Sequence, residues 1–198
     1  MLVLASASPR RQELLRNAGI TFEAQPSNIQ EDAQPGEPAK DCAERLAREK
    51  ALEVASQFPN DTVLGADTVV VVDGEMLGKP ADLADAARML RLLSGRDHHV
   101  ITGVCLVADG QSFVASETTL VTVNKITDQE IVDYVATGEP LDKAGGYAIQ
   151  GIASRWIPRI EGDYCNVVGL PVALVFRMLR EIGSGFQKTQ SPSFFSAY

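Results

Sequence analysis

The stretch TVLGADTVVVVDG, residues 62–74, decides the fold of this chain. Its β-branched apolar residues are typical of a strand, and Asp73-Gly74 is a strong two-residue hairpin signal that predicts a second strand directly after it. The run is broken only by Gly65-Ala66-Asp67-Thr68, and an unpaired carboxylate in an apolar strand is destabilising. Asp67 therefore has two interpretations: it ends one strand and caps a turn, or it has a chemical role.

Helices and strands alternate on both sides of this stretch. Residue spacing and turn signals predict helices near residues 9–18, 38–58, 83–93, 127–138 and 172–182, and strands at residues 2–5, 20–24, 100–107, 113–123, 147–149 and 156–160. Because hairpins occur together with strand–helix units, we expect an α/β domain with a mixed sheet. Residues 183–198 show no useful periodicity and are expected to form a tail.

Composition restricts the class of protein. The 198 residues suit one compact domain or two packed lobes around a shared cleft, and 45% of them are hydrophobic. No apolar run approaches the roughly 18 to 20 residues that span a bilayer, and the start MLVLASASPRRQ lacks the features of a secretory signal. The formal net charge of −8 argues against nucleic-acid and membrane partners. A cytoplasmic protein is therefore expected.

Several common catalytic and metal-binding patterns are missing. The sequence has no GxxxxGK[ST] phosphate loop, no HExxH and no GxSxG motif. Cys42, Cys105 and Cys165 are far apart in the sequence, which predicts reduced thiols. His98 and His99 are adjacent on a predicted strand, so their side chains point to opposite faces and cannot line one site. Histidine-based triads and zinc sites are therefore poor candidates.

Cations instead occupy unusual places in the sequence. Arg10 and Arg11 lie at the start of a predicted helix, where the helix dipole disfavours positive charge unless an anion such as phosphate binds there. Lys50 lies on the inner side of a predicted helix, where it either extends its ammonium to solvent or directs it into a cleft. Lys79 lies in a Gly-Lys-Pro loop, and the glycine-rich residues 142–147 allow a ligand to approach closely.

Taken in their order along the chain, these features resemble the Maf family of nucleoside triphosphate pyrophosphatases. The motifs that carry the resemblance are SASPRR (6–11), LAREKA (46–51), GADT (65–68), GKP (78–80), LDKAGGYAIQG (141–151) and VVGLP (167–171). The resemblance covers residues 1–182 and implies the Maf/ITPase-like fold, a twisted mixed sheet flanked by helices with two lobes around a central cleft. GADT together with IQG is similar to the branch that hydrolyses dTTP and UTP. A homodimer is expected from the resemblance alone.

The resemblance implies a role for each matching residue. Asp67 would be the general base that activates water, and Glu31 would hold a divalent metal with it, Mg²⁺ or Mn²⁺; the alternative for Glu31 is a solvated loop acid. The residues expected to contact the phosphates are Ser6, Arg10, Arg11, Lys50 and Lys79. The residues expected to govern selectivity are Arg11, Thr68 and Gln150. The amide of Gln150 offers both a donor and an acceptor to the edge of thymine or uracil.

The reaction implied by the resemblance is attack of water on the α-phosphorus, which expels pyrophosphate and leaves dTMP or UMP. Two alternatives stay open. The first is the same reaction on 7-methyl-GTP or another modified nucleotide. The second is a nucleotide-binding regulator of cell division or septum formation without meaningful catalysis. A nucleic-acid-binding role conflicts with the acidic balance and with the absence of a basic, aromatic-rich segment.

Overall fold

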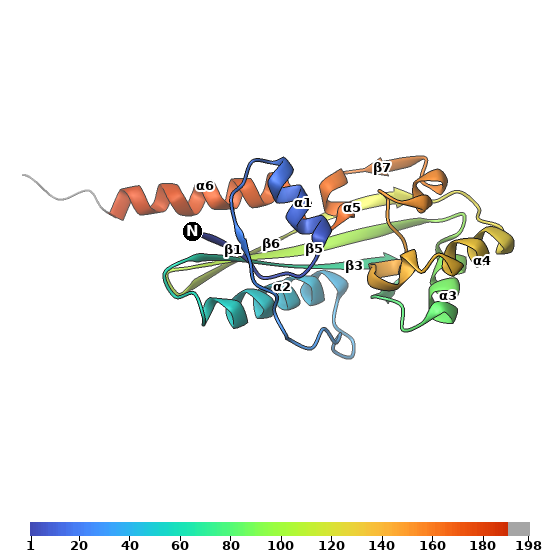
Figure 1. Ribbon diagram of the computed structural model, residues 1–198, viewed down its shortest axis with the longest axis horizontal. Coiled ribbons are helices and arrows are strands. Elements are labelled where there is room, and N and C mark those ends of the chain that lie inside the picture. The colour runs from blue at the N-terminus through green and yellow to red at the C-terminus, as the bar shows by residue number, and fades with distance from the viewer. Residues whose placement is uncertain (190–198) are drawn as a thin grey trace, which may run out of the picture.

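The computed structural model describes residues 1–189, and within them the chain forms a seven-stranded mixed sheet (Figure 1). The strands are β1 (Leu2–Leu4), β2 (Glu23–Ala24), β3 (Thr62–Val72), β4 (Glu75–Leu77), β5 (Asp97–Ala108), β6 (Gln111–Thr122) and β7 (Arg159–Glu161). Their order is β2-β1-β3-β5-β6-β7, with β4 paired to the end of β3. β1 pairs in parallel with β2 and β3, and the other pairs are antiparallel. The long strands β3, β5 and β6 thus form the centre of the molecule.

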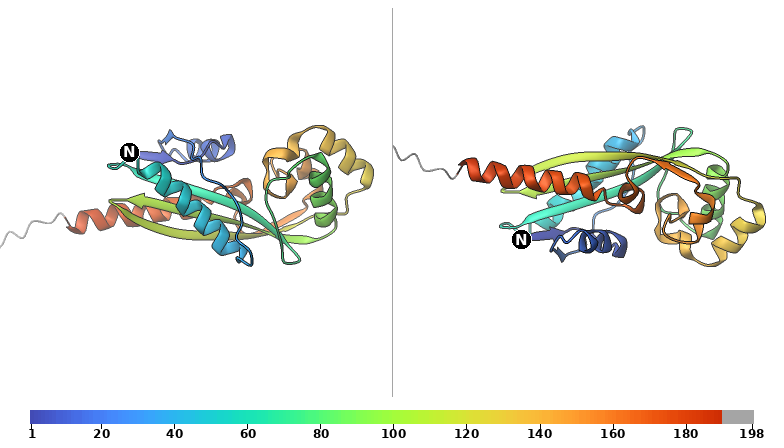
Figure 2. Two further views of the ribbon diagram at one scale, coloured as in Figure 1. Left: turned by 90° about the horizontal axis from the view of Figure 1, so that it is seen from below. Right: turned by 90° about the horizontal axis from the view of Figure 1, so that it is seen from above.

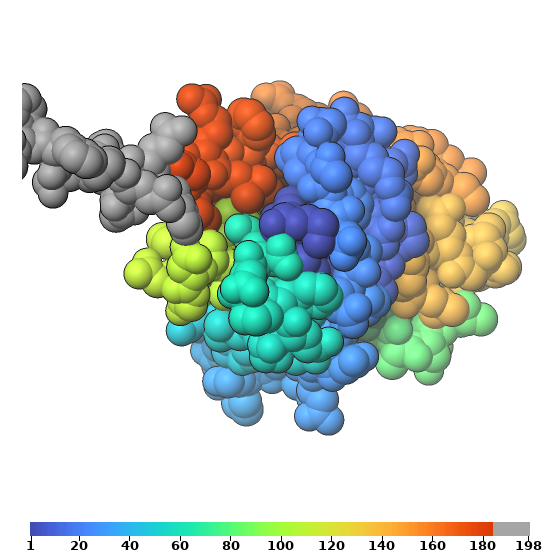
Figure 3. Space-filling model, turned by 60° about the vertical axis from the view of Figure 1, so that its left-hand side comes forward, coloured from blue at the N-terminus to red at the C-terminus, as the bar shows by residue number. Residues whose placement is uncertain are grey.

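Helices cover both faces of this sheet. They are α1 (Pro9–Asn17), α2 (Ala39–Ala55), α3 (Leu83–Leu93), α4 (Asp128–Ala136), α5 (Tyr164–Val168) and α6 (Val172–Thr189), with 3-10 turns η1 (Glu139–Asp142), η2 (Ala144–Gly146) and η3 (Ile152–Trp156). α2 lies on the face opposite to α6, whereas α3 and α4 lie at the far end of the long strands from α6 (Figures 1 and 2). Figure 3 shows the blue segment between α1 and α2 crossing one face of the molecule, beside the orange-red α6.

Buried apolar side chains of the described residues form three clusters. One lies between α2 and the sheet and includes Ala47, Ala51, Val63 and Cys105. A second, on the opposite face, packs α1 and α6 against the sheet through residues such as Leu15, Leu64, Leu106 and Val175. The third joins α3 and α4 to the far ends of the strands and includes Leu90, Val100, Ile131 and Trp156. The two ends of the sheet therefore have separate cores, which makes the molecule two-lobed.

Two glycines let α2 pack directly on the sheet. A Cβ on Gly65 in β3 would lie 2.1 Å from the carbonyl oxygen of Ala47, and a Cβ on Gly103 in β5 would lie 2.3 Å from that of Ala43. Because no side chain fits in this space, glycine is required where the helix backbone meets the strand. Side chains alternate along a strand, so Gly65 and Asp67 face the same side. The helix therefore passes close to Asp67.

The strand that decides the fold is confirmed over residues 62–72. Asp73 and Gly74 both have positive φ, 48° and 83°, and form the predicted hairpin turn between β3 and β4. β3 runs through Asp67 without a break, and Asp67 lies opposite Gly103 of β5. Asp67 therefore does not end a strand or cap a turn, and the first interpretation of this residue is wrong.

Two predicted strands are wrong or too long. Residues 147–149 form no strand, and the buried side chain of Tyr147 contacts His98 through its hydroxyl group. The strand predicted at residues 20–24 contains only Glu23–Ala24. Both segments contain apolar residues that pack on the core without extended pairing, so their pattern does not distinguish a strand from an irregular segment.

The strand predicted at residues 156–160 begins later than expected. Trp156 ends η3, and the strand contains only Arg159–Glu161. The indole packs edge to face against Tyr134 of α4, with ring centroids 5.3 Å apart, and its Nε1 donates to Glu130 at 3.2 Å. These tertiary contacts fix the backbone of Trp156 in a turn, although its propensity favours a strand.

The last helix extends beyond its predicted end at Ile182. α6 continues to Thr189 and so enters the predicted tail, residues 183–198. Residues 190–198 of that segment lie outside the described residues, and the boundary between domain and tail stays a prediction. Within the described part of the chain, no helix combines the length and apolar character needed to cross a membrane.

Candidate active site

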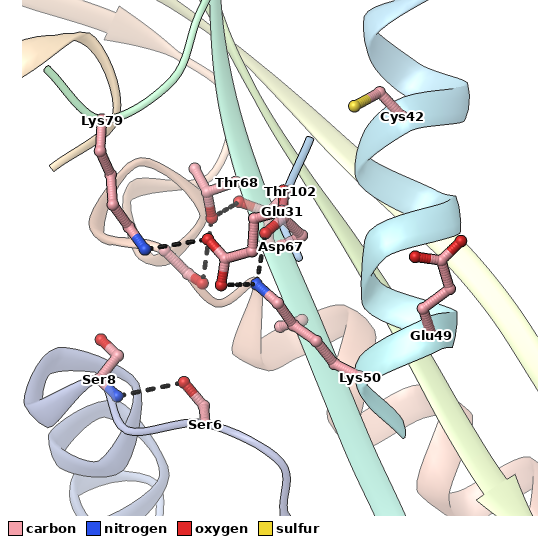
Figure 4. Close-up of polar contacts among 12 residues, drawn as sticks. Ser6, Ser8, Glu31, Cys42, Glu49, Lys50, Asp67, Thr68, Lys79 and Thr102 are labelled. Carbon is pink, nitrogen blue, oxygen red and sulfur yellow. Dashed lines mark hydrogen bonds and ion pairs between the residues drawn. The ribbon is translucent and has the colours of Figure 1, made fainter. Parts of the chain in front are cut away.

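Lys50 and Asp67 form an ion pair between α2 and β3 (Figure 4). Lys50 Nζ donates to Asp67 Oδ1 at 2.6 Å, and the two side chains are only 5% and 9% exposed. The close packing at Gly65 brings the helix to this distance. Lys50 therefore directs its ammonium into the molecule instead of extending it to solvent. Charges buried so deeply are stable only with partners, and such buried charged pairs often lie at functional sites. The pair is therefore a candidate for the centre of an active site.

Glu31 lies between two lysines (Figure 4). Its Oε1 contacts Lys50 Nζ at 2.8 Å, and its Oε2 accepts from Lys79 Nζ at 2.9 Å. Partial burial favours the neutral form of Glu31, but the hydrogen bonds and charges of the two lysines outweigh burial and lower its pKa to about 2. The carboxylate is therefore ionised at neutral pH. It holds two cations in place, which a freely solvated loop acid would not do.

The start of α1 approaches the same place. Ser8 caps the helix by accepting a hydrogen bond from the Arg11 amide, and Pro9 occupies the first turn. Ser6 Oγ accepts from the Ser8 amide at 3.2 Å, so the residues before the helix form a tight turn. Arg10 extends across to the other lobe, where its Nη1 donates to Asp142 Oδ2 at 3.1 Å.

The Arg11 guanidinium is held by protein oxygens. It donates to the carbonyls of Gly169 at 2.8 Å and Ala66 at 2.9 Å, and to the hydroxyls of Thr68 at 3.1 Å and Ser6 at 3.4 Å. Burial lowers the pKa of Arg11, and nearby carboxylates oppose this effect. The side chain thus ties α1 to β3 and to the end of α5, and it fixes the position of the Thr68 hydroxyl.

A buried polar network supports Thr68. Its Oγ1 lies 2.9 Å from Oγ1 of Thr102, which donates to the Asn166 carbonyl at 3.2 Å. The Asn166 amide in turn donates to the Val100 carbonyl and to Thr119 Oγ1, both at 2.9 Å. The sequence alone does not point to Thr102, Asn166 or Thr119 as members of this site. Thr68 and Thr102 are direct cross-strand partners, but that signal is readable only when the register of the two strands is known.

The loop after α4 closes the other side of the site. Asp142 accepts from Arg10 and also from Lys143 Nζ at 2.5 Å. Lys143 donates in addition to the Glu139 carbonyl. The sequence indicates this loop by its glycines and predicts no role for the side chains of Asp142 and Lys143. Their position opposite Arg10 depends on the packing of two segments that are distant in sequence.

The same loop is fastened to β5 by a buried pair. Tyr147 Oη lies 2.6 Å from His98 Nε2, and the two rings pack edge to face. Burial lowers the pKa of His98 to about 4, so the imidazole is neutral at physiological pH. His98 is buried and His99 is exposed, which confirms that the two histidines face opposite sides. Gln150, a few residues after Tyr147, is exposed at the rim of the site.

All the predicted site residues line one cavity of about 820 Å³. They are Ser6, Arg10, Arg11, Glu31, Lys50, Asp67, Thr68, Lys79 and Gln150. Both lobes contribute to its lining, which confirms the predicted central cleft. Its volume lies within the roughly 300 to 1,000 Å³ of typical small-molecule sites. Cations around a single cavity in an acidic chain suit a ligand that is a multiply charged anion.

The carboxylates present also fit a divalent cation. Asp67 and Glu31 contact the Lys50 ammonium at 2.6 and 2.8 Å, so the two carboxylates lie close enough to each other to share a cation. Mg²⁺ is often bound by one or two carboxylates together with substrate phosphates, and this pair matches that donor set. Among the described residues, no group of three or more His, Cys, Asp or Glu side chains is placed to hold a metal by itself. A metal at this site would therefore need ligands from the substrate or from water.

Known proteins resemble this chain over most of its length. The model of the Maf-like protein family matches residues 1–182. A dTTP/UTP pyrophosphatase of Koribacter versatilis is 59% identical, and the match covers 92% of this chain and 94% of that protein. A protein of the same name from Symbiobacterium thermophilum is 52% identical, over 92% of this chain and 94% of that protein. Another from Thermococcus gammatolerans is 51% identical, over 92% of this chain and 97% of that protein. The Staphylococcus aureus Ham1 protein matches with 14% identity and a TM-score of 0.40, covering 62% of this chain and 71% of its own, a likeness too slight to bear on function. The chain belongs to the Maf family.

Proposed function

We propose that this chain hydrolyses dTTP and UTP to the monophosphate and pyrophosphate with the help of a divalent metal. The observation that carries the proposal is the position of Asp67. This carboxylate is buried in the wall of a cavity that Arg10, Lys50 and Lys79 also line. The names of the relatives that are 51% to 59% identical support the same activity.

In the proposed reaction, water attacks the α-phosphorus in line with the bond to the bridging oxygen. Asp67 accepts a proton from the attacking water, and the bond between the α-phosphorus and that oxygen breaks as the new one forms. Lys50 holds the Asp67 carboxylate through the 2.6 Å hydrogen bond and so fixes its direction. The products are a nucleoside monophosphate and pyrophosphate, and the proton leaves Asp67 to solvent.

The leaving pyrophosphate carries several negative charges that must be neutralised. Arg10, Lys50 and Lys79 reach the cavity from different elements, so they can contact different phosphate oxygens. A divalent metal held by Asp67 and Glu31 would supply further positive charge to the phosphate oxygens. Glu31 contacts both Lys50 and Lys79 and so holds the two ammonium groups at one place in the cavity.

Selectivity for the base is assigned to Gln150 and Thr68, which also line the cavity. Gln150 offers an amide donor and an acceptor, which complement the imide edge of thymine or uracil. Thr68 is held by Arg11 and Thr102, so its hydroxyl has a fixed position. A hydroxyl fixed in this way discriminates against bases that would leave it unpaired.

The test is release of pyrophosphate by the purified chain from a panel of nucleoside triphosphates, with Mg²⁺, Mn²⁺ or a chelator. Highest kcat/KM for dTTP and UTP, lost with the chelator, is the expected result. Highest kcat/KM for 7-methyl-GTP would replace the substrate but keep the reaction. Binding of dTTP without metal-dependent turnover would contradict the enzyme and favour a nucleotide-binding regulator.

A further inference from the structure

Two carboxylates in the cavity each hold two cations. Glu31 lies between Lys50 and Lys79. On the other side, Asp142 lies between Arg10 and Lys143. Its carboxylate contacts Arg10 at 3.1 Å and Lys143 at 2.5 Å. Asp142, Arg10 and Lys143 all line the cavity. The side chain of Asp142 is 64% exposed and those of Arg10 and Lys143 are 27% and 13% exposed, so the carboxylate is the accessible member of this group and the one that an anion from solution would replace.

We propose that Arg10 and Lys143 form a second anion subsite, at which phosphate oxygens of the nucleotide or of pyrophosphate displace the Asp142 carboxylate. Lys143 thereby becomes a further phosphate-binding residue. The identity of the anion as a phosphate chain rests on the proposed function, whereas the exchange of Asp142 for an external anion rests on the contacts in the cavity.

The two cations have donors left for a ligand. The Lys143 ammonium has three hydrogens, and Asp142 and the Glu139 carbonyl accept two of them. The Arg10 guanidinium donates to the carboxylate of Asp142 and, at 3.4 Å, to the backbone carbonyl of Asp142, and its other N–H groups are available to a ligand. The Lys143 side chain is only 13% exposed, so its stem is held and its ammonium stays near the cavity.

The exchange is favourable because the two anions differ in charge. An exposed ion pair contributes little to stability, since water solvates both partners. A phosphate chain carries more negative charge than one carboxylate and offers several oxygens, so it can contact both cations at once. Arg10 comes from α1 and Lys143 from the loop between η1 and η2. A phosphate bound to both would therefore also hold the two lobes together.

The test is the dissociation constant of inorganic pyrophosphate with Mg²⁺, measured by calorimetry on the full chain. For Lys143→Gln we expect binding weaker by about tenfold, the loss of one charge-assisted hydrogen bond. For Asp142→Asn we expect binding tighter by roughly threefold to tenfold, because the internal competitor loses its charge while the cations remain. A merely structural role for Asp142 would not produce tighter binding.

Asp73→Asn is the matched control. Asp73 is 67% exposed and forms an ion pair with Arg96 at 2.6 Å, and its loss changes the net charge by the same amount. Pyrophosphate binding should not change in this variant. Unchanged or weaker binding by Asp142→Asn, or equal tightening by Asp73→Asn, would overturn the subsite. Lys143→Arg, which keeps the charge, should bind much more tightly than Lys143→Gln, and equal weakening in both would also overturn it.

Turnover separates this proposal from the proposed function. A chain that releases pyrophosphate from dTTP but shows no effect of Asp142→Asn on binding loses only the subsite. A chain that binds pyrophosphate with the expected pattern but does not turn over any triphosphate keeps the subsite and loses the proposed reaction. Failure of the unmodified chain to bind pyrophosphate at all would overturn the subsite directly.

Discussion

In the wall of the cavity formed by α2 and β3, Lys50 and Asp67 are both buried, whereas in the wall formed by α1 and the loop after α4 the ion pair of Arg10 and Asp142 is more exposed. Lys50 and Asp67 are 5% and 9% exposed, and both lie on regular elements. Arg10 and Asp142 are 27% and 64% exposed, and Asp142 lies at the end of a 3-10 turn. Breaking a buried pair is costly and breaking an exposed one is not. The first wall therefore suits a catalytic group of fixed position, and the second suits contacts that exchange with a ligand.

The largest effect should come from replacing the acid of the buried wall. Asp67→Asn keeps the shape of the side chain and removes its ability to accept a proton. We expect kcat for dTTP to fall on the order of a thousandfold, about 4 kcal/mol of transition-state stabilisation. Lys50 retains Glu31 as a partner, so the variant should still fold. Turnover is measured by pyrophosphate release, and folding by circular dichroism.

The control for this prediction is a substitution in the other wall. Asp142→Asn removes one charge from the exposed wall and should change kcat far less than Asp67→Asn does. Equal losses in the two variants would mean that the walls do not differ in the way the burial indicates. Near-normal turnover by Asp67→Asn would exclude Asp67 as the general base.

The second effect concerns the packing that creates the buried wall. A Cβ on Gly65 would lie 2.1 Å from the Ala47 carbonyl and 2.8 Å from the Ala51 amide, both backbone atoms of α2. We therefore expect Gly65→Ala to lower the free energy of unfolding by about 3 kcal/mol, because the helix must move away from the sheet. The midpoint of urea unfolding measures this change. Turnover should fall as well, since Lys50 moves with the helix.

Gly183→Ala is the control for this packing effect. Gly183 lies in α6, and a Cβ there would meet nothing within 4 Å. Alanine has the higher helix propensity, so this variant should be as stable as the unmodified chain or slightly more stable. If Gly65→Ala were equally harmless, the close contact between α2 and β3 would not be what positions Lys50.

The sequence predicts the local features of this fold better than the contacts between segments. The strand at residues 62–72 and its Asp73-Gly74 turn have local signals, and both are present. The sequence does not decide the inward direction of Lys50, because helical spacing shows which face a side chain lies on but not what it contacts. The sequence predicts a strand at Trp156, because its contacts with α4 are tertiary and cannot be detected from neighbouring residues.

Sequence motifs identify the residues of the candidate site, but they do not identify the hydrogen bonds and ion pairs between them. Resemblance to the Maf family marked Arg10 and Asp67, and they line one cavity. The partners that hold them could not be predicted in the same way. Arg10 and Asp142 are 132 positions apart, and Thr102 meets Thr68 only through the register of β3 and β5. Such pairs follow from the packing of the lobes, which no single stretch of sequence specifies.

The smallest predicted effect concerns acid stability and tests Glu31, a carboxylate from the segment before α2 that contacts Lys50 of the buried wall. The pKa of Glu31 is lowered from 4.5 to about 2 in the folded chain, where burial opposes and Lys50 and Lys79 favour its ionised form. A depressed folded pKa means that the ionised group stabilises the fold above pH 4.5, and that this contribution disappears as pH falls through about 2. Because Glu31 is 39% exposed, solvent screening reduces the contribution to below about 1 kcal/mol.

Unfolding free energies of the unmodified chain and Glu31→Gln, compared from pH 6 to pH 2, measure this contribution. The unmodified chain should be the more stable at pH 6, and the difference should shrink as the pH falls below 4.5, because protonation removes the charge that the substitution has already removed. A difference that stayed constant over this range would show that Glu31 stabilises the fold by packing or neutral hydrogen bonds. In that case Lys50 and Lys79 would not depend on the charge of Glu31. The difference between the buried wall and the more exposed wall would then rest on the ion pair of Lys50 and Asp67 alone.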